Sequence, residues 1–324
     1  MKQSGSTFIS YFSFILIFSL LVLTSCDDLF FHKSERFEDA RTYFSKSDTN
    51  SVHFFVLSDW GFSGRYGQKQ VASEMAEISK IVGLDFILTA GDNFQVAGVQ
   101  SATDSLWYDN YENIYKDSAL LVPWYPVLGN HDHYGNVDAQ VEYGKLNPRW
   151  RMLATYYTFV QPIDTVVGIR FIMLDTQNFV DEFSDETLAD SIAQYVWLKD
   201  VLKHNTEKWI IVVGHHPVYS ASTFHGDTPV MNTLVKPLLN QYDVDFYICG
   251  HDHHFEHARD GSYTDYIVTG TGGYVRPVDS NNHSVYSLSS LGFTYVSASR
   301  EKLNLYFITS EAKIAYQLSK QKKL

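Results

Sequence analysis

Short apolar runs alternate with longer amphipathic stretches along most of this chain, and this alternation restricts the fold more than any other feature. Apolar runs with the character of strands buried on both faces occupy residues 52–57, 85–89, 124–128, 169–174, 209–213 and 245–248. Stretches with helical character lie at 67–82, 103–118, 137–146, 185–204 and 230–241. Strands that alternate with helices in this way are typical of an α/β fold.

The character of the sequence changes after residue 262, where strands and turns follow one another. Apolar runs there occupy 266–269, 293–296, 303–307 and 314–318. They predict a second, more antiparallel sheet that packs on the first. Because no internal repeat and no linker divides the chain, we expect residues 51–324 to form one domain.

Five of the apolar runs lead into a segment that combines glycine with a residue able to bind a metal ion. These segments are Ser58-Asp59-Trp60-Gly61, Ala90-Gly91-Asp92-Asn93, Leu128-Gly129-Asn130-His131-Asp132, Val213-Gly214-His215-His216 and Cys249-Gly250-His251-Asp252-His253-His254. Because ligands bind at the carboxyl ends of strands in open α/β sheets, we expect the five segments to converge. A single Asp or His of this kind is more typical of a turn or a helix cap. The repetition at five strand ends is what predicts a site.

Imidazole and carboxylate groups together suit zinc, iron and manganese. Four of the 13 histidines lie between residues 251 and 257, which strengthens the prediction of a metal centre. Two ions a few ångströms apart need a carboxylate that both of them share, and Asp92 is the natural bridge.

The same segments resemble the metallophosphoesterase superfamily, and within it the purple acid phosphatases of the short, tartrate-resistant type. The resemblance runs from about residue 52 to the C-terminus and includes Gly135-Asn136-Val137 and the neighbourhood of 145–150. It implies a four-layer α/β/β/α sandwich of the calcineurin-like type with two metal ions. One ion would be held by Asp59, Asp92 and His253, and the other by Asp92, Asn130, His215 and His251.

Three further residues acquire expected roles from this resemblance. His131 would contact the phosphate, and Asp132 would orient the His131 ring. His225, within Phe224-His225-Gly226, lies where the family has a second histidine on the substrate side. It would bind the phosphate or protonate the leaving group, a contribution that histidine often makes.

The sequence departs from the purple acid phosphatase pattern at Gln95, where the family has a tyrosine whose phenolate binds ferric iron. An amide oxygen is a neutral and weaker ligand than a phenolate. We therefore expect a colourless protein with a more permissive metal pair, iron with zinc or manganese, or two zinc ions.

The resemblance implies a metal-dependent phosphoric monoester hydrolase of the acid phosphatase type, in which a metal-bound hydroxide attacks a small phosphoester. A phosphodiesterase or nucleotidase on the same scaffold is the first alternative. The second alternative is a non-catalytic surface protein that keeps the metals, and the third is a purely structural role for all the motif residues. The natural substrate, the pH optimum and the oligomeric state are left open by the sequence.

The first residues predict export. An apolar run at 8–23 follows Lys2 and ends in Leu23-Thr24-Ser25-Cys26, which resembles the signal-peptidase site of bacterial lipoproteins. We expect residues 1–25 to be a signal peptide and 26–50 a lipid anchor and tether, with the lipid on Cys26. The domain would then face the periplasm or the surface of the cell envelope. An uncleaved membrane anchor is the alternative, for which the run is slightly short.

The net charge and the cysteine content limit the possible partners and disulfide bonds of the protein. The net charge of −12, without a Lys/Arg-rich run, argues against nucleic acid as a partner. An anionic substrate then requires a local cation in the site. If Cys26 carries lipid, Cys249 has no partner for an intrachain disulfide, and we expect it to be a small buried apolar residue.

Overall fold

The computed structural model describes residues 37–44, 50–181 and 185–322. The predicted export signal and Cys26 lie outside these residues. None of the helices in the described part is both long and apolar enough to span a bilayer.

The first sheet contains seven strands and combines both ends of the domain. In spatial order these are β1 (Glu38–Asp39), β14 (Lys313–Gln321), β13 (Lys302–Thr309), β12 (Gly292–Ala298), β2 (Val52–Leu57), β3 (Phe86–Ala90) and β4 (Trp124–Val127). The strands β2, β3 and β4 are parallel to one another, whereas the remaining pairs are antiparallel.

The second sheet also has seven strands. Their order is β11 (Ser284–Leu288), β9 (Phe255–Ala258), β10 (Asp265–Thr269), β8 (Phe246–Cys249), β7 (Trp209–Val213), β6 (Gly168–Met173) and β5 (Tyr157–Pro162). The parallel strands β6, β7, β8 and β10 form its centre, and antiparallel strands lie at both edges.

The predicted division into an early parallel sheet and a late antiparallel sheet is wrong. The last three strands, β12, β13 and β14, extend the first sheet beside β2, while β10 pairs in parallel with β8 in the second. Hydrophobic periodicity identifies a strand and its buried face, but it carries no information about which neighbour the strand pairs with. Both sheets are therefore mixed.

The two sheets pack face to face through aromatic side chains. Phe54 of β2 stacks on Phe86 of β3, with ring centroids 5.0 Å apart, and meets the edge of Phe171 from the other sheet at 5.3 Å. Farther along, Phe255 and Phe307 stack across the interface at 4.6 Å. These rings are essentially removed from solvent, so the interface forms the main apolar core of the domain.

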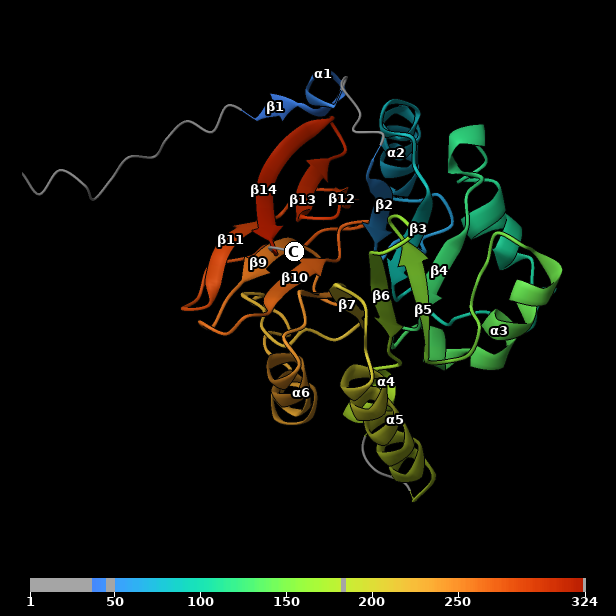
Figure 1. Ribbon diagram of the computed structural model, residues 1–324. Helices are drawn as coiled ribbons and strands as arrows, with labels where there is room; N and C mark the ends of the chain where they lie inside the picture. The colour runs from blue at the N-terminus through green and yellow to red at the C-terminus, as the bar shows by residue number, and fades with distance from the viewer. Residues whose placement is uncertain (1–36, 45–49, 182–184, 323–324) are drawn as a thin grey trace, which may run out of the picture. The chain divides into compact units, whose positions relative to one another are not determined.

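Helices cover the outer faces of both sheets (Figure 1). The helix α2 (Gln68–Val82) covers the first sheet and ends at Gly83, whose φ of 71° forms a left-handed C-cap. The second sheet is covered by α4 (Gln177–Val180), α5 (Asp185–Lys203) and α6 (Lys236–Gln241), which bury Phe179, Leu198 and Leu239 against its outer face. This arrangement confirms the expected four-layer α/β/β/α sandwich. The free thiol of Cys249 is buried in that outer layer, as predicted.

The beginning of the domain lies earlier than residue 51. Within the segment expected to be a tether, β1 pairs with β14, and α1 (Ala40–Tyr43) follows directly. Arg41 forms an ion pair with Glu74 of α2, and the Phe44 ring packs on Tyr295 at 4.8 Å. Two such short elements have no detectable period in the sequence, which explains why residues 38–44 were expected to be part of the tether.

Candidate metal centre

The predicted convergence of strand ends is present in the structure. Asp59, Asp92 and Asn130 follow β2, β3 and β4 of the first sheet, while His215, His251 and His253 follow β7 and β8 of the second. Hydrogen bonds join the two sets. Within the first set, the amide of Asp59 donates to the carbonyl of Gly91 at 3.1 Å, and between the sets the amide of His251 donates to Asp59 Oδ2 at 3.0 Å.

One group of potential ligands centres on Asp59. Its Oδ1 lies 3.3 Å from His253 Nε2, and both Asp59 Oδ1 and His253 Nδ1 are buried without a hydrogen-bond partner. Asp59, Asp92 and His215 each offer a ligand atom, and these atoms lie within 4.8 Å of one another. Buried polar atoms normally have partners, so this concentration of free acceptors fits a bound cation.

The second group centres on Asn130. Its Oδ1 lies 3.1 Å from His215 Nε2 and 3.0 Å from His251 Nδ1, and His215 Nε2 also lies 3.4 Å from Asp92 Oδ1. The other nitrogen of His215, Nδ1, lies 2.8 Å from the carbonyl of Ala90, which accepts only. Nδ1 must therefore carry the proton in the neutral ring, which leaves a lone pair on Nε2 that faces other acceptors. A metal ion at this position would satisfy all of them.

The pKa values of these groups reflect the same crowding of charge. Burial and the neighbouring charge of Asp59 raise the pKa of Asp92 well above its usual range. Burial and the charge of His215 lower the pKa of His251, which favours the neutral, metal-binding imidazole. Burial alone would raise the pKa of Asp59, but the charge of His253 holds this pKa below its usual range.

The backbone at this site is strained where it carries ligands. Asp59, Asp92 and His251 have φ angles of 54°, 50° and 67°, a region that residues with a side chain rarely adopt. The glycines beside them permit close approach. A Cβ at Gly250 would lie 1.9 Å from Ser58 Oγ, and one at Gly129 would lie 2.2 Å from Asp92 Oδ1. The geometry of the ligands therefore depends on these glycines.

Asp132 differs from its expected role. Its Oδ2 accepts hydrogen bonds from the amides of Gly129 and Asn93, and its Oδ1 accepts from the amide of Phe94 and from Gln140 Nε2. The bonds from Asn93 and Phe94 fasten the loop after β3 to the loop after β4, the bond from Gln140 reaches α3 (Val137–Leu146), and none of the four reaches the His131 ring. Asp132 thus holds the two ligand-bearing loops together, because a buried carboxylate stabilises the amides that converge on it.

His131 and His225 both line a cleft of about 520 Å³ that opens over Asp92, Asn130, His251 and His253. The amide of His131 donates to Asp92 Oδ1 at 3.0 Å, and its ring lies 5.5 Å from Tyr134. The His225 ring packs 4.3 Å from the His251 ring. The structure thus brings both histidines to the same opening as the potential ligands.

Gln95 points at the expected bridging residue. Its Nε2 donates to Asp92 Oδ2 at 2.9 Å, and its amide nitrogen donates to the carbonyl of Gly61. A longer ring at this position would reach the same region. The departure from the phenolate pattern thus lies directly beside the group of ligands.

The remaining wall of the cleft was not predicted from the sequence. Phe62, Tyr66 and Tyr274 form an aromatic cluster with ring centroids 5.1 to 6.5 Å apart, and the Tyr274 ring lies 5.9 Å from that of His253. Arg276 also lines the cleft. These residues lie in loops of irregular sequence, and no motif in that sequence marked them.

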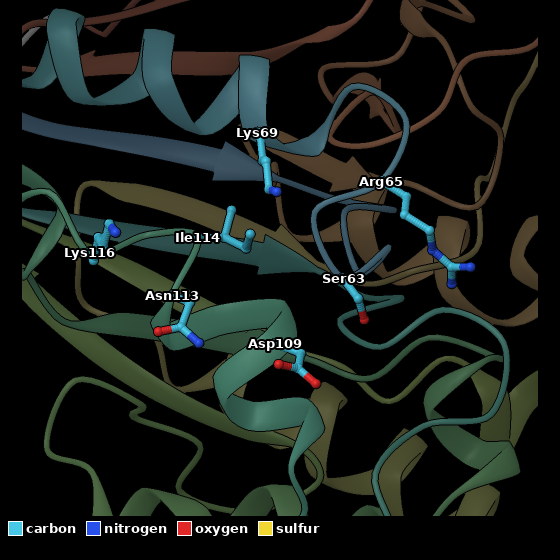
Figure 2. Close-up of a pocket in the computed structure, with 7 residues that line it drawn as sticks. All are labelled: Ser63, Arg65, Lys69, Asp109, Asn113, Ile114 and Lys116. Atoms are coloured by element: carbon cyan, nitrogen blue, oxygen red, sulfur yellow. The ribbon is translucent and has the colours of Figure 1, made fainter.

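A second pocket lies beside the turn that carries Ser63 and Arg65 (Figure 2). It is lined by Ser63, Arg65, Lys69, Asp109, Asn113, Ile114 and Lys116. In the close-up, Lys69 extends from α2 toward the pocket and Arg65 extends from the turn. Residues of the turn thus alternate between the two pockets, with Phe62 and Tyr66 facing the cleft.

Comparisons with known proteins agree with this geometry. Residues 52–255 match the family of calcineurin-like phosphoesterases. The chain belongs to this family. Human tartrate-resistant acid phosphatase type 5 is 32% identical over 296 residues, which cover 83% of this chain and 90% of the human protein. Purple acid phosphatase 17 of Arabidopsis thaliana is 34% identical over 261 residues, which cover 73% of this chain and 74% of the plant protein.

Solved structures of the family have the same fold. GAP50, described as the anchor in the inner membrane complex of Plasmodium, superposes with a TM-score of 0.77 at 26% identity, covering 85% of this chain and 90% of GAP50. Purple acid phosphatase PPD1 from yellow lupin gives a TM-score of 0.64 at 16% identity, covering 86% of this chain and 54% of that one. The second likeness concerns the fold alone.

An ion pair beside the metal centre gives a testable dependence of stability on pH. His133 Nε2 lies 2.9 Å from Asp175 Oδ1 and joins the loop after β4 to the end of β6. Burial lowers the pKa of His133, but the hydrogen bond and the charge of Asp175 outweigh burial, and the net pKa is raised above 6.5. The folded protein thus holds this proton more tightly than the unfolded chain.

Replacing His133 by Gln should therefore cost most stability below pH 6.5, and the difference should shrink as pH rises through the raised pKa. Urea denaturation of both proteins at several pH values measures this difference. His204→Gln removes an exposed ring that pairs with Asp200 and serves as the control. A constant difference across the pH range would contradict the assignment.

Proposed function

We propose that this chain is a metal-dependent phosphatase that hydrolyses phosphomonoesters at a centre of two metal ions. The convergence of six metal-binding side chains from two sheets in one cleft carries this proposal. The acid phosphatase relatives support it, because they cover most of the domain at about a third identity.

The positions of the side chains suggest which residues would bind each ion. Asp59, Asp92 and His253 would hold one ion, and Asp92, Asn130, His215 and His251 would hold the other. When bound, the two ions activate water as a nucleophile and neutralise charge on the phosphoryl group. This supplies the local cation that a protein with a net charge of −12 needs for an anionic substrate.

The protein contributes two histidines that face the same opening. His131, beside Asp92, can donate a hydrogen bond to a phosphoryl oxygen. His225 lies on the outer side of His251 and can transfer a proton to the leaving oxygen. Burial, together with the charge of Arg276, lowers the pKa of His225, whereas the charge of Asp252 acts in the opposite direction.

The bridging role of Asp92 is tested by Asp92→Asn in a soluble protein that begins after Cys26. We expect loss of both ions and a fall in hydrolysis of p-nitrophenyl phosphate well beyond the 10–100-fold typical of residues that only support ligands. Metal content and kcat are measured on the same samples. Asp109→Asn, an exposed carboxylate in the second pocket, should keep both. Near-normal turnover in Asp92→Asn would refute the bridge.

A diesterase or a non-catalytic protein predicts different results for the unmodified chain. Faster hydrolysis of bis-p-nitrophenyl phosphate than of the monoester would favour a diesterase. Two bound ions per chain without turnover of either substrate would favour a metal-holding surface protein.

We further propose that the metal pair is iron with zinc or manganese and that it is colourless. Gln95 supports this, because its amide donates to Asp92 at the position where a phenolate would bind ferric iron. Gln95→Tyr should therefore gain a visible charge-transfer band in the ferric-loaded protein, measured by absorption spectroscopy with metal analysis. Gln95→Phe has a similar ring without the oxygen and should gain none. A strong visible band in the unmodified protein would contradict the proposal.

The domain is proposed to be a bacterial lipoprotein of the cell envelope, anchored through Cys26. The apolar run at 8–23 and the Leu23-Thr24-Ser25-Cys26 sequence support this. In a bacterial host, Cys26→Ser should abolish incorporation of radiolabelled palmitate. Cys249→Ser is the matched control, because that thiol is buried. Unchanged labelling in Cys26→Ser would contradict lipidation at this residue.

A further inference from the structure

Arg276 is held against the metal centre by its own backbone. It lies in the loop after β10, and its amide donates to the carbonyl of His253 at 2.9 Å. Its side chain lines the cleft together with His225 and Tyr274. Any movement of Arg276 is thus restrained by a residue that offers a ligand to the metal.

The guanidinium is also fixed in orientation. Its central carbon lies 3.8 Å from the centroid of the Phe224 ring, a stacking distance for a cation on an aromatic face. The Phe224 ring in turn contacts the ring of His225, with centroids 4.5 Å apart. This places a fixed positive charge beside the histidine proposed to assist the leaving group.

One nitrogen of this guanidinium has no partner. Arg276 Nη1 is buried from solvent and makes no hydrogen bond, and no carboxylate among the described residues forms an ion pair with Arg276. A buried donor without a partner is costly, and a charged one more so. Such a group is retained where a ligand completes its bonds.

The guanidinium of Arg276 indicates which kind of group would accept its hydrogen bonds. A guanidinium presents several N–H groups in a planar fork that matches the oxygens of phosphate or carboxylate. Asp92, the carboxylate that lines the cleft together with Arg276, belongs to the proposed metal centre and is not available to the guanidinium. We propose that Arg276 binds an oxyanion of the substrate in this cleft.

This inference rests on the proposed function, because it assigns the oxyanion to a phosphoester substrate. Two parts of such a substrate supply an oxyanion of this kind, namely the phosphoryl group that is transferred and a second anionic group elsewhere on the molecule. The exposed rings of Tyr66 and Tyr274 beside the metal centre leave room for the rest of such a molecule.

The second pocket provides a matched control. Its cations, Arg65, Lys69 and Lys116, are all exposed, so none of them bears the cost of a buried charge. Arg65 Nε donates to the carbonyl of Phe62, close to the cleft in sequence but facing the other pocket. Arg65→Gln therefore removes the same charge near the site without removing a group from the cleft (Figure 2).

The experiment is calorimetric titration of the metal-loaded protein with inorganic phosphate. If Arg276 binds the phosphoryl group that is transferred, loss of a charged hydrogen bond in Arg276→Gln should weaken phosphate binding about 10–100-fold. Arg276→Lys, which keeps the charge but loses the fork, should give an intermediate loss, and it serves as the test if the Gln variant does not fold. Arg65→Gln should bind phosphate like the unmodified protein. Metal content is measured for each variant.

Steady-state kinetics then separate the two sources. If Arg276 binds the transferred group, Arg276→Gln weakens phosphate binding and raises KM for phenyl phosphate. If it binds a second group, phosphate binding is kept and KM rises for a nucleoside bisphosphate alone. Phosphate affinity and both KM values equal to those of the unmodified protein would overturn the proposal. If the unmodified protein has no turnover but Arg276→Gln still binds phosphate more weakly than the unmodified protein, the role of Arg276 stands and the proposed function fails.

Discussion

Two carboxylates that are buried side by side govern this structure. Asp59 and Asp92 follow neighbouring parallel strands, and the charge of Asp59 helps to raise the pKa of Asp92. Like charges in a low-dielectric interior destabilise the fold unless cations compensate them. The imidazoles of His215 and His253 face these carboxylates from the second sheet, yet the His215 ring already donates its proton to a carbonyl. The charge of His253 compensates Asp59 in part, and metal ions would complete the compensation, so the site and the stability of the sandwich depend on the same groups.

The sandwich makes this concentration of charge possible by fixing the loops that carry it. The aromatic core around Phe54 and Phe171 sets how the two sheets face each other. At the strand ends, Asp132 accepts hydrogen bonds from the amides of Asn93 and Phe94 that fasten two of the loops, and Gly250 allows close approach to Asp59. The strained backbone at the potential ligands is tolerated because these contacts hold the loops in one conformation. Together these contacts support the geometry of the potential ligands.

Local chemistry in the sequence predicted the convergence of the strand ends, because each potential ligand follows an apolar strand. Asp92 and His215 were identified from the strand ends, and the family resemblance supplied the pairing of ligands. Features that depend on tertiary contacts were not predictable in this way. The sheet to which β12 belongs is decided by pairing with β2, and the role of Asp132 is decided by amides that converge on it only in the fold. Arg276 lies in an irregular loop, and only the three-dimensional structure reveals its unpartnered nitrogen.

The most direct test of this account is anomalous diffraction from crystals of the metal-loaded protein, recorded at the absorption edges of iron, zinc and manganese. The account predicts two ions in the cleft, one bound by Asp59 and His253 and the other by Asn130, His215 and His251, with the carboxylate of Asp92 bound to both. A single ion, or two ions that do not share Asp92, would contradict it.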